Sequence, residues 1–162
     1  MIIPKGSKGL ELATRICFDP DGDDLRLLLL KFKEVMNSPE GERAVALASN
    51  QVVSNTNHGA PTAYYYNNRM FINASYSSVE CPQTVISYET CMSDPNAVYG
   101  VPRYPSVVVR YQQLIIVAGQ LKLSSQYTLL CRGYPAIVHQ HEIDHTNGAG
   151  IWRTGTLLGQ VH

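Results

Sequence analysis

The sequence of 162 residues predicts an α+β fold in which antiparallel or mixed β-sheets pack around a central helix that carries an HExxH motif, with a second helix near the N-terminus. Three observations predict this class. Apolar residues recur at helical spacing behind an acidic start, a long middle stretch is rich in β-formers, and helix start and stop signals enclose the motif. Neither a linker nor a repeat divides the chain, so we expect one domain over residues 1–162.

The N-terminal helix is predicted over residues 25–38. Asp23 and Asp24 supply an acidic start, apolar residues follow at helical spacing, and Pro39 ends the pattern. The acidic stretch also suggests a calcium loop. An EF-hand loop needs Gly at its sixth position and Glu at its twelfth, where this chain has Asp24 and Leu30. We therefore interpret the stretch as a solvated helix cap.

The middle of the chain is rich in Val, Ile and Tyr, and its runs are broken by Asn-Asn, Pro and Ala-Gly turn signals. Three consecutive tyrosines at residues 64–66 lack interleaved basic residues, so we expect strand packing there rather than a nucleic-acid stacking platform. The predicted strands are residues 63–66, 70–76, 84–88, 106–111, 114–117 and 121–129.

Composition narrows the class of protein. The chain is 44% hydrophobic and 16% charged, and its 13 basic residues equal its 13 acidic ones, which gives no indication of a nucleic-acid surface. No apolar run approaches the roughly 20 residues that span a bilayer, and the N-terminal stretch lacks a signal-peptide core. We expect a cytoplasmic protein with no nucleic-acid or membrane partner, in which the four cysteines are free thiols.

The last predicted helix begins near Tyr134 and ends at Asn147 and Gly148, and it contains the HExxH motif. Residues i and i+4 share one helical face, so the imidazoles of His141 and His145 can reach one metal ion. Glu142 lies between them and can act on a water molecule without being a ligand. The motif predicts a catalytic metal site.

A catalytic site of this kind needs a third protein ligand. No Glu or Asp follows Asp144, where thermolysin-like enzymes have their third ligand, and the last position of a metzincin motif is Ile151. His162 is the chain terminus and a poor choice for an ordered ligand. We therefore expect the third ligand upstream of the motif.

The best upstream candidate is Cys91, which follows a β run and lies in a polar, turn-like segment closed by Asp94 and Pro95. Thiolate binds Zn²⁺ or Fe²⁺ strongly, and Cys/His/His is a known catalytic set. Cys81 and Cys131 remain rivals on chemistry alone.

These residues together resemble the peptide deformylase family, whose motifs GxGxAAxQ, EGCLS and QHExDH follow in this order. The third is intact over residues 140–145, and the second reads ETCMS over residues 89–93. The first reads AVALASNQ and matches at Ala48 and Gln51. The family's glycines are replaced by Ala44, Ala46 and Thr90, and these side chains predict a narrower groove or slower catalysis.

The resemblance implies the roles of the site residues. Glu142 would act as the general base, while the Gln51 amide and the backbone N–H of Met92 would stabilise an oxyanion. One divalent ion is implied, Fe²⁺ in the native protein, with Zn²⁺ or Ni²⁺ as substitutes. Its ligands would be Cys91, His141 and His145.

An apolar pocket beside the metal is also expected. Ile137 and Val138 precede His141 by four and three residues and so flank the metal-facing side of the helix. With Val45 and Ala46 they would form a substrate pocket for a methionine side chain. A role in the helix core is an equally good and compatible interpretation. His139 points to another face, and we interpret it as structural or solvent-exposed.

The implied reaction is metal-dependent removal of the N-formyl group from the formyl-methionine of nascent polypeptides, at the ribosome, with release of formate. Two alternatives remain. A non-catalytic relative that binds nascent chains is suggested by the altered glycines, although binding alone needs neither Glu142 nor Gln51. An HExxH metallopeptidase of another kind is disfavoured because the downstream ligand is missing.

Overall fold

A computed structural model describes residues 1–160, and within them the named strand pairs are all antiparallel. The expected α+β fold with antiparallel sheets is confirmed. The α-helices are α1 (Gly22–Met36), α2 (Ser49–Val52), α3 (Tyr134–Thr146) and α4 (Ile151–Thr154). Short 3₁₀ turns occur at Lys8–Glu11, Asp19–Asp21 and Thr56–His58.

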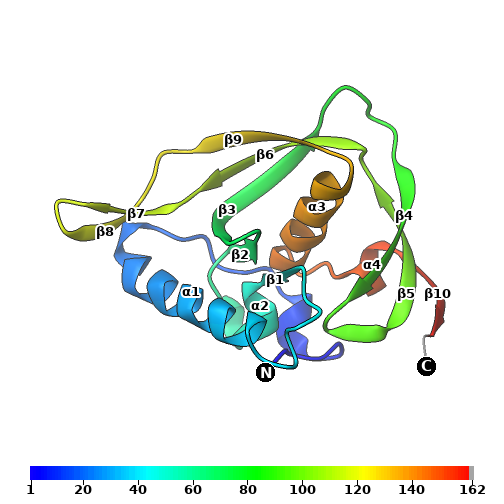
Figure 1. Cartoon of the computed structure of the whole chain (residues 1–162), viewed down its shortest axis with the longest axis horizontal. Coiled ribbons are helices and arrows are strands. Elements are labelled where there is room, and N and C mark those ends of the chain that lie inside the picture. The colour runs from blue at the N-terminus through cyan, green and yellow to red at the C-terminus, as the bar shows by residue number, and fades with distance from the viewer. Residues whose placement is uncertain (161–162) are drawn as a thin grey trace.

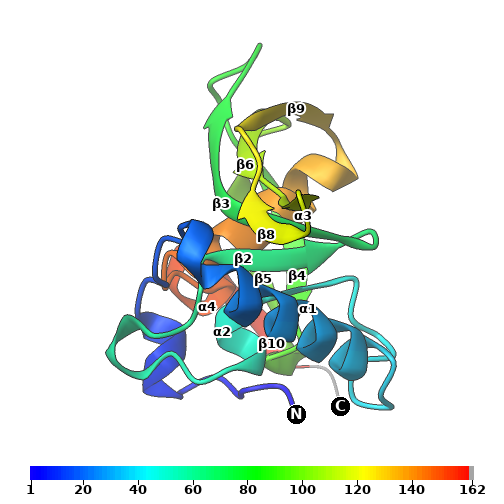
Figure 2. The same ribbon diagram turned by 90° about the vertical axis from the view of Figure 1, so that its left-hand side faces the viewer.

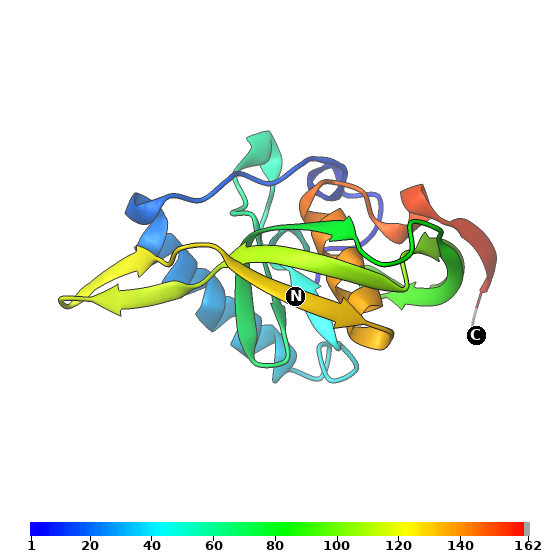
Figure 3. The same cartoon turned by 90° about the horizontal axis from the view of Figure 1, so that it is seen from above.

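A five-stranded sheet has the order β1-β2-β3-β6-β9, and Figure 3 shows β6 between β3 and β9. A three-stranded sheet has the order β10-β5-β4, while β7 and β8 form a hairpin that projects from the body. The strands of the first sheet are β1 (Ala46–Ala48), β2 (Ala63–Tyr66), β3 (Arg69–Ser78), β6 (Ser106–Gln112) and β9 (Tyr127–Arg132). The others are β4 (Val85–Cys91), β5 (Asp94–Arg103), β10 (Thr156–Gln160), β7 (Leu114–Val117) and β8 (Gln120–Leu123).

Helix α1 is amphipathic, as its apolar spacing predicts. Leu25, Leu28, Phe32 and Val35 are buried at intervals of three and four residues, which is the spacing of one helical face. This face packs into a cluster with Leu47 and other residues of β1–β3. Figure 2 shows α1 and α2 together below β2, with β3, β6 and β9 above them.

Helix α3 lies between the two larger sheets (Figure 1). One side packs on the five-stranded sheet through Ala136 and Ile143, in a cluster with Val107 of β6. The helix ends at Thr146, and Gly148, two residues later, has φ +75° and would place a Cβ 2.7 Å from the backbone carbon of Leu12. Only glycine fits this stop, because it tolerates both positive φ and close backbone approach.

Two strand predictions are wrong. The run 121–129 is divided between β8 and β9, because residues 120–123 pair with β7 whereas residues 127–132 pair with β6. Strand β5 was missed because Pro95, Gly100 and Pro102 weaken its strand pattern. Pro95 and Pro102 lie outside residues 97–100, the part of β5 that pairs with β10. Neither has an N–H to donate, so each is tolerated where β5 does not have paired strands on both sides.

Strands β1 and β10 were also missed. β1 has only three residues, and each residue of β10 is exposed, so neither produces an alternating pattern. No helix among residues 1–160 is both long and apolar enough to cross a membrane.

Candidate metal centre

Three candidate ligand atoms converge between α3 and the end of β4. One ligand atom each from Cys91, His141 and His145 lies within 4.8 Å of the others, and the Cys91 Sγ is 3.1 Å from the His145 Nε2. The structure thereby distinguishes the cysteines that the sequence left as rivals. Cys81 is exposed before β4, and Cys131 is buried in β9 against the core of the five-stranded sheet. His162 lies outside the described residues.

Strand geometry explains why Cys91 faces the histidines. It is the last residue of β4, where it pairs with Asp94, and Met92 and Ser93 form the turn into β5. The expected turn closed by Asp94 is present at Met92 and Ser93, but Cys91 belongs to the strand before it and not to the turn. Side chains alternate along a strand, so Glu89 and Cys91 point to the same, buried side.

The environment of Cys91 favours the thiolate, which is the form that binds metals. Burial by itself raises the pKa of this thiol, and the side chain is only 4% exposed. The charge of His145 and hydrogen bonds with both imidazoles outweigh burial and hold the pKa well below its ordinary value. One thiolate and two imidazoles are a donor set that suits Fe²⁺ or Zn²⁺.

Glu142 is buried beside these ligands. Burial raises the pKa of its carboxyl group, with the charges of His141 and His145 acting in the opposite direction. Its Oε2 atom has no hydrogen-bond partner among residues 1–160. Buried carboxylate oxygens are normally satisfied, so this atom is free to accept a proton or hydrogen bond from a bound water or substrate.

Gln51 lies in α2 with its side chain held in one orientation. Its Oε1 accepts a hydrogen bond from the backbone N–H of Ala48 at 2.9 Å. Its Nε2 donates to the Ser93 Oγ at 3.1 Å and lies 3.5 Å from the Cys91 Sγ. The amide N–H groups of Gln51 therefore point towards the candidate ligands. Met92, the first residue of the turn after Cys91, lines a cleft over the candidate ligands.

The cleft over the ligands has a volume of about 420 Å³. All four residues expected to form the substrate pocket line it, namely Val45, Ala46, Ile137 and Val138. The sequence did not indicate other parts of its wall, because they come from separate elements and carry no motif. These are Arg43, Ser87, Tyr88 and Tyr134, and they lie with Thr90 along the cleft.

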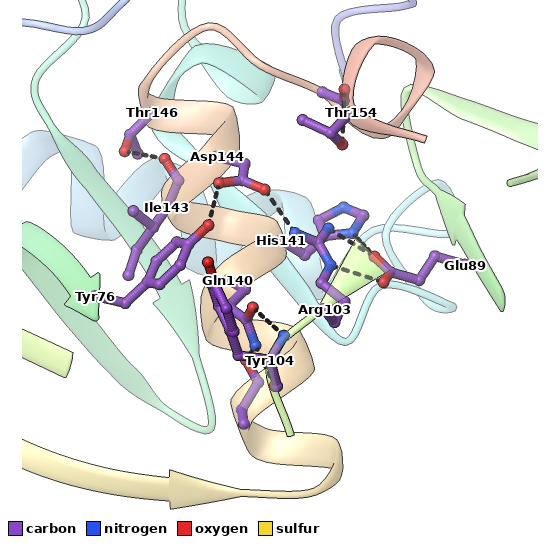
Figure 4. A network of polar contacts seen from close by, with 12 residues as sticks. Tyr76, Glu89, Arg103, Tyr104, Gln140, His141, Ile143, Asp144, Thr146 and Thr154 are labelled. Carbon is purple, nitrogen blue, oxygen red and sulfur yellow. Dashed lines mark hydrogen bonds and ion pairs between the residues drawn. The ribbon is translucent and has the colours of Figure 1, made fainter. Parts of the chain in front are cut away.

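The candidate ligand His141 has a partner of its own, Glu89, which also lines the cleft. Its Nδ1 lies 2.8 Å from the Glu89 Oε1, and Arg103 donates two hydrogen bonds to Glu89, at 2.8 and 2.9 Å (Figure 4). Burial raises the pKa of Glu89, but hydrogen bonds from His141 and Arg103 outweigh it and lower the pKa to about 2. The Glu89 carboxylate therefore holds the ring of His141 in place.

The remaining histidine of α3, His139, is in a different environment. His139 is buried, not solvent-exposed, with its Nδ1 2.7 Å from the Tyr64 hydroxyl and its ring against Tyr66 and Phe71. Burial lowers its pKa to about 4. Its interpretation as a structural residue agrees with this aromatic setting.

Comparisons with known proteins all identify deformylases as similar to this chain. A sequence profile described as "Polypeptide deformylase" matches residues 10–154. Peptide deformylase 2 of Geobacillus stearothermophilus is 32% identical over 166 residues, covering 91% of this chain and 84% of that protein. A match to the peptide deformylase of Latilactobacillus sakei has 43% identity over 61 residues. It covers 37% of this chain and 29% of that relative, so it spans under a third of the relative's length.

A solved structure is similar over nearly the whole chain. It is the crystal structure of PDF from the Vibrio parahaemolyticus bacteriophage VP16T in complex with actinonin, with a TM-score of 0.72 and 25% sequence identity. The match covers 93% of this chain and 98% of that one.

Proposed function

The chain belongs to the polypeptide deformylase family, and we propose that it hydrolyses the formyl amide of N-formyl-methionyl polypeptides, releasing formate and a free methionine amine. The observation that carries this proposal is the convergence of Cys91, His141 and His145 beside the unpartnered oxygen of Glu142, at the floor of a cleft. In this proposal residues 1–162 form one catalytic domain, with α3 as its central helix and α1 as its N-terminal helix.

Cys91, His141 and His145 would hold one divalent ion. When bound, the ion supplies Lewis acidity and makes hydroxide available near neutral pH. The thiolate and imidazoles suit Fe²⁺, Zn²⁺ and Ni²⁺ alike. We propose Fe²⁺ as the native ion because the family resemblance implies iron.

Glu142 acts as the general acid and base. Its free Oε2 accepts the proton of the attacking water and returns it to the departing amine. Burial raises the pKa of Glu142, which makes the carboxylate a stronger base for the proton of the water.

Gln51 and Met92 stabilise the charge that develops on the formyl oxygen. The Gln51 side chain is already oriented by Ala48 and Ser93, and the N–H that is not donated to Ser93 lies near the Cys91 Sγ, so it needs little rearrangement during the reaction. The backbone N–H of Met92, in the turn after Cys91, is the second donor. Donors held in this way stabilise the transition state more than the ground state.

The apolar wall of the cleft selects the methionine side chain. Val45, Ala46, Ile137 and Val138 offer hydrocarbon surface beside the ligands, and the cleft is large enough for one side chain and the adjoining backbone. We propose that the substrates are nascent polypeptides met at the ribosome, in the cytoplasm.

Formate release from a formyl-Met tripeptide by the anaerobically purified chain tests the proposal. The matched control is the same tripeptide without its formyl group. We expect formate from the first and no peptide-bond cleavage in either. Cleavage of the unformylated tripeptide would indicate a metallopeptidase, whereas tight binding without formate would indicate a non-catalytic relative.

The identity of the ion has a separate test. Metal-free protein loaded anaerobically with Fe²⁺ is expected to turn over faster than protein loaded with Zn²⁺, and to lose activity in peroxide. Fe²⁺ and the Cys91 thiolate are both oxidisable, while Zn²⁺ has no redox chemistry. Equal rates for the two ions would contradict the iron assignment and leave the reaction unchanged.

A further inference from the structure

A chain of polar side chains leads from the candidate ligand His141 through the core to Tyr76 on β3 (Figure 4). Beyond Glu89, the Arg103 Nη1 lies 2.5 Å from the Asp144 Oδ2. The Tyr76 hydroxyl donates to the other oxygen of Asp144 at 3.0 Å. Tyr76 also forms part of the wall of a second cleft of about 420 Å³, on a different side of α3 from the ligands.

Each link in this chain restricts the orientation of the next. Arg103 binds Glu89 through two nitrogens, so the planar guanidinium fixes the carboxylate that meets His141. The third nitrogen of Arg103 is fixed by Asp144. The Arg103 side chain is only 2% exposed, so water has little access to replace these partners.

Charge explains why a hydroxyl is needed at the end. Glu89 pairs with both Arg103 and His141, whereas Asp144 shares Arg103 and has no other ion-pair partner among residues 1–160. A carboxylate oxygen left without a donor in such a place is costly. The Tyr76 hydroxyl supplies that donor. Burial and then the charge of Asp144 raise the pKa of Tyr76, so the hydroxyl keeps its proton.

We propose that Tyr76 is a positioning residue for the metal centre: its hydroxyl holds Asp144 and, through Arg103 and Glu89, the imidazole of His141. This inference rests on the proposed ion site and not on the proposed reaction. It makes the wall of the second cleft a determinant of how firmly the ion is held.

The test compares Tyr76→Phe with Tyr104→Phe. Both tyrosines line the second cleft, and the Tyr104 hydroxyl has no hydrogen bond among residues 1–160 that would link it to the chain of side chains. Each substitution removes one hydroxyl and leaves the ring. Zinc-loaded protein is mixed with excess chelator, and the rate of zinc release is measured without substrate.

We expect zinc release several-fold faster in Tyr76→Phe, up to about tenfold, because Tyr76 acts through three other side chains and the loss of a direct outer partner of a ligand costs about tenfold or more. Release from Tyr104→Phe should stay within about twofold of wild type. In an Asp144→Ala background, Tyr76→Phe should add nothing, because the link through which it acts is already absent.

Two results would overturn the inference: zinc release from Tyr76→Phe at the wild-type rate, or an undiminished effect in the Asp144→Ala background. Thermal melting of the metal-free proteins distinguishes a general loss of stability from a specific effect on the ion site. A general loss would lower the melting temperature without changing zinc release. Because no substrate is present, a chain that fails to release formate still gives a decisive result here.

Discussion

Histidines lie on both faces of helix α3, but their surroundings differ. On the sheet side, His139 is paired with the Tyr64 hydroxyl and enclosed by aromatic rings. On the cleft side, the Glu142 Oε2 is buried without a hydrogen-bond partner among residues 1–160. A fully satisfied face stabilises the fold, whereas unsatisfied polar atoms indicate a face prepared for a ligand. The unpartnered oxygen of Glu142, rather than the presence of a histidine, distinguishes the cleft side of α3 from its packing side.

Electrostatics reinforces the division. Burial lowers the pKa of His139 to about 4, so its ring stays neutral in the core. On the cleft side the neighbours decide: they hold the pKa of Cys91 well below its ordinary value in spite of burial. Helix α3 thus contributes a neutral histidine to the packing on one side and two imidazoles beside the Cys91 thiolate on the other.

The largest expected difference between the cleft side and the sheet side of α3 comes from replacing one buried cysteine next to each of them. Cys91→Ser is expected to weaken binding of the ion by more than about a hundredfold, because a direct ligand contributes more than the outer partners whose loss costs up to that factor. Cys131→Ser, at an equally buried cysteine of the sheet side, should retain one ion per chain. Metal analysis after dialysis measures both. Loss of the ion from Cys131→Ser alone would reverse the ligand assignment.

A smaller effect should separate binding from chemistry within the cleft. Gln51→Leu is expected to lower kcat by about a hundredfold with a smaller change in KM, because an oxyanion donor acts on charge that develops in the transition state. Steady-state formate release at several peptide concentrations measures both constants. A rise in KM with unchanged kcat would instead make Gln51 a ground-state binding residue.

The prediction for the sheet side concerns stability and its dependence on pH. Unfolded His139 takes up a proton near its ordinary pKa of 6.5, while folded His139 resists protonation until about pH 4. Its contribution to stability is therefore present above pH 6.5 and lost as the pH falls towards 4, by up to about 3 kcal/mol. Urea unfolding at pH 7 and pH 4.5 should show a shallower loss in His139→Gln than in wild type. Equal losses would contradict the neutral, buried histidine.

The sequence predicts the local part of this structure well. The helices α1 and α3 follow from apolar spacing and end signals, and strands such as β2, β6 and β7 follow from compact runs of β-formers. Strand β5 does not follow from its sequence, because prolines normally argue against a strand. They are tolerated here because β10 pairs only with residues 97–100, between the two prolines. That pairing joins distant segments and leaves no local pattern.

The candidate site divides in the same way. His141 and His145 lie one helical turn apart, so their spacing alone places them together. Cys91 lies 54 residues before His145 and competed with other cysteines until the motif around it was matched. The cleft residues Arg43 and Tyr134 had no signal, because folding alone brings them beside the ligands.

The most direct test of the account is formate release by three proteins with equal iron content: wild type, Glu142→Gln and His139→Gln. Glu142→Gln preserves size while removing the base, so we expect it to be at least about a hundredfold slower than wild type with its iron retained. His139→Gln should retain both iron and most of the wild-type rate. Near-normal turnover by iron-loaded Glu142→Gln, or loss of iron from His139→Gln, would contradict the division of α3 into a catalytic face and a packing face.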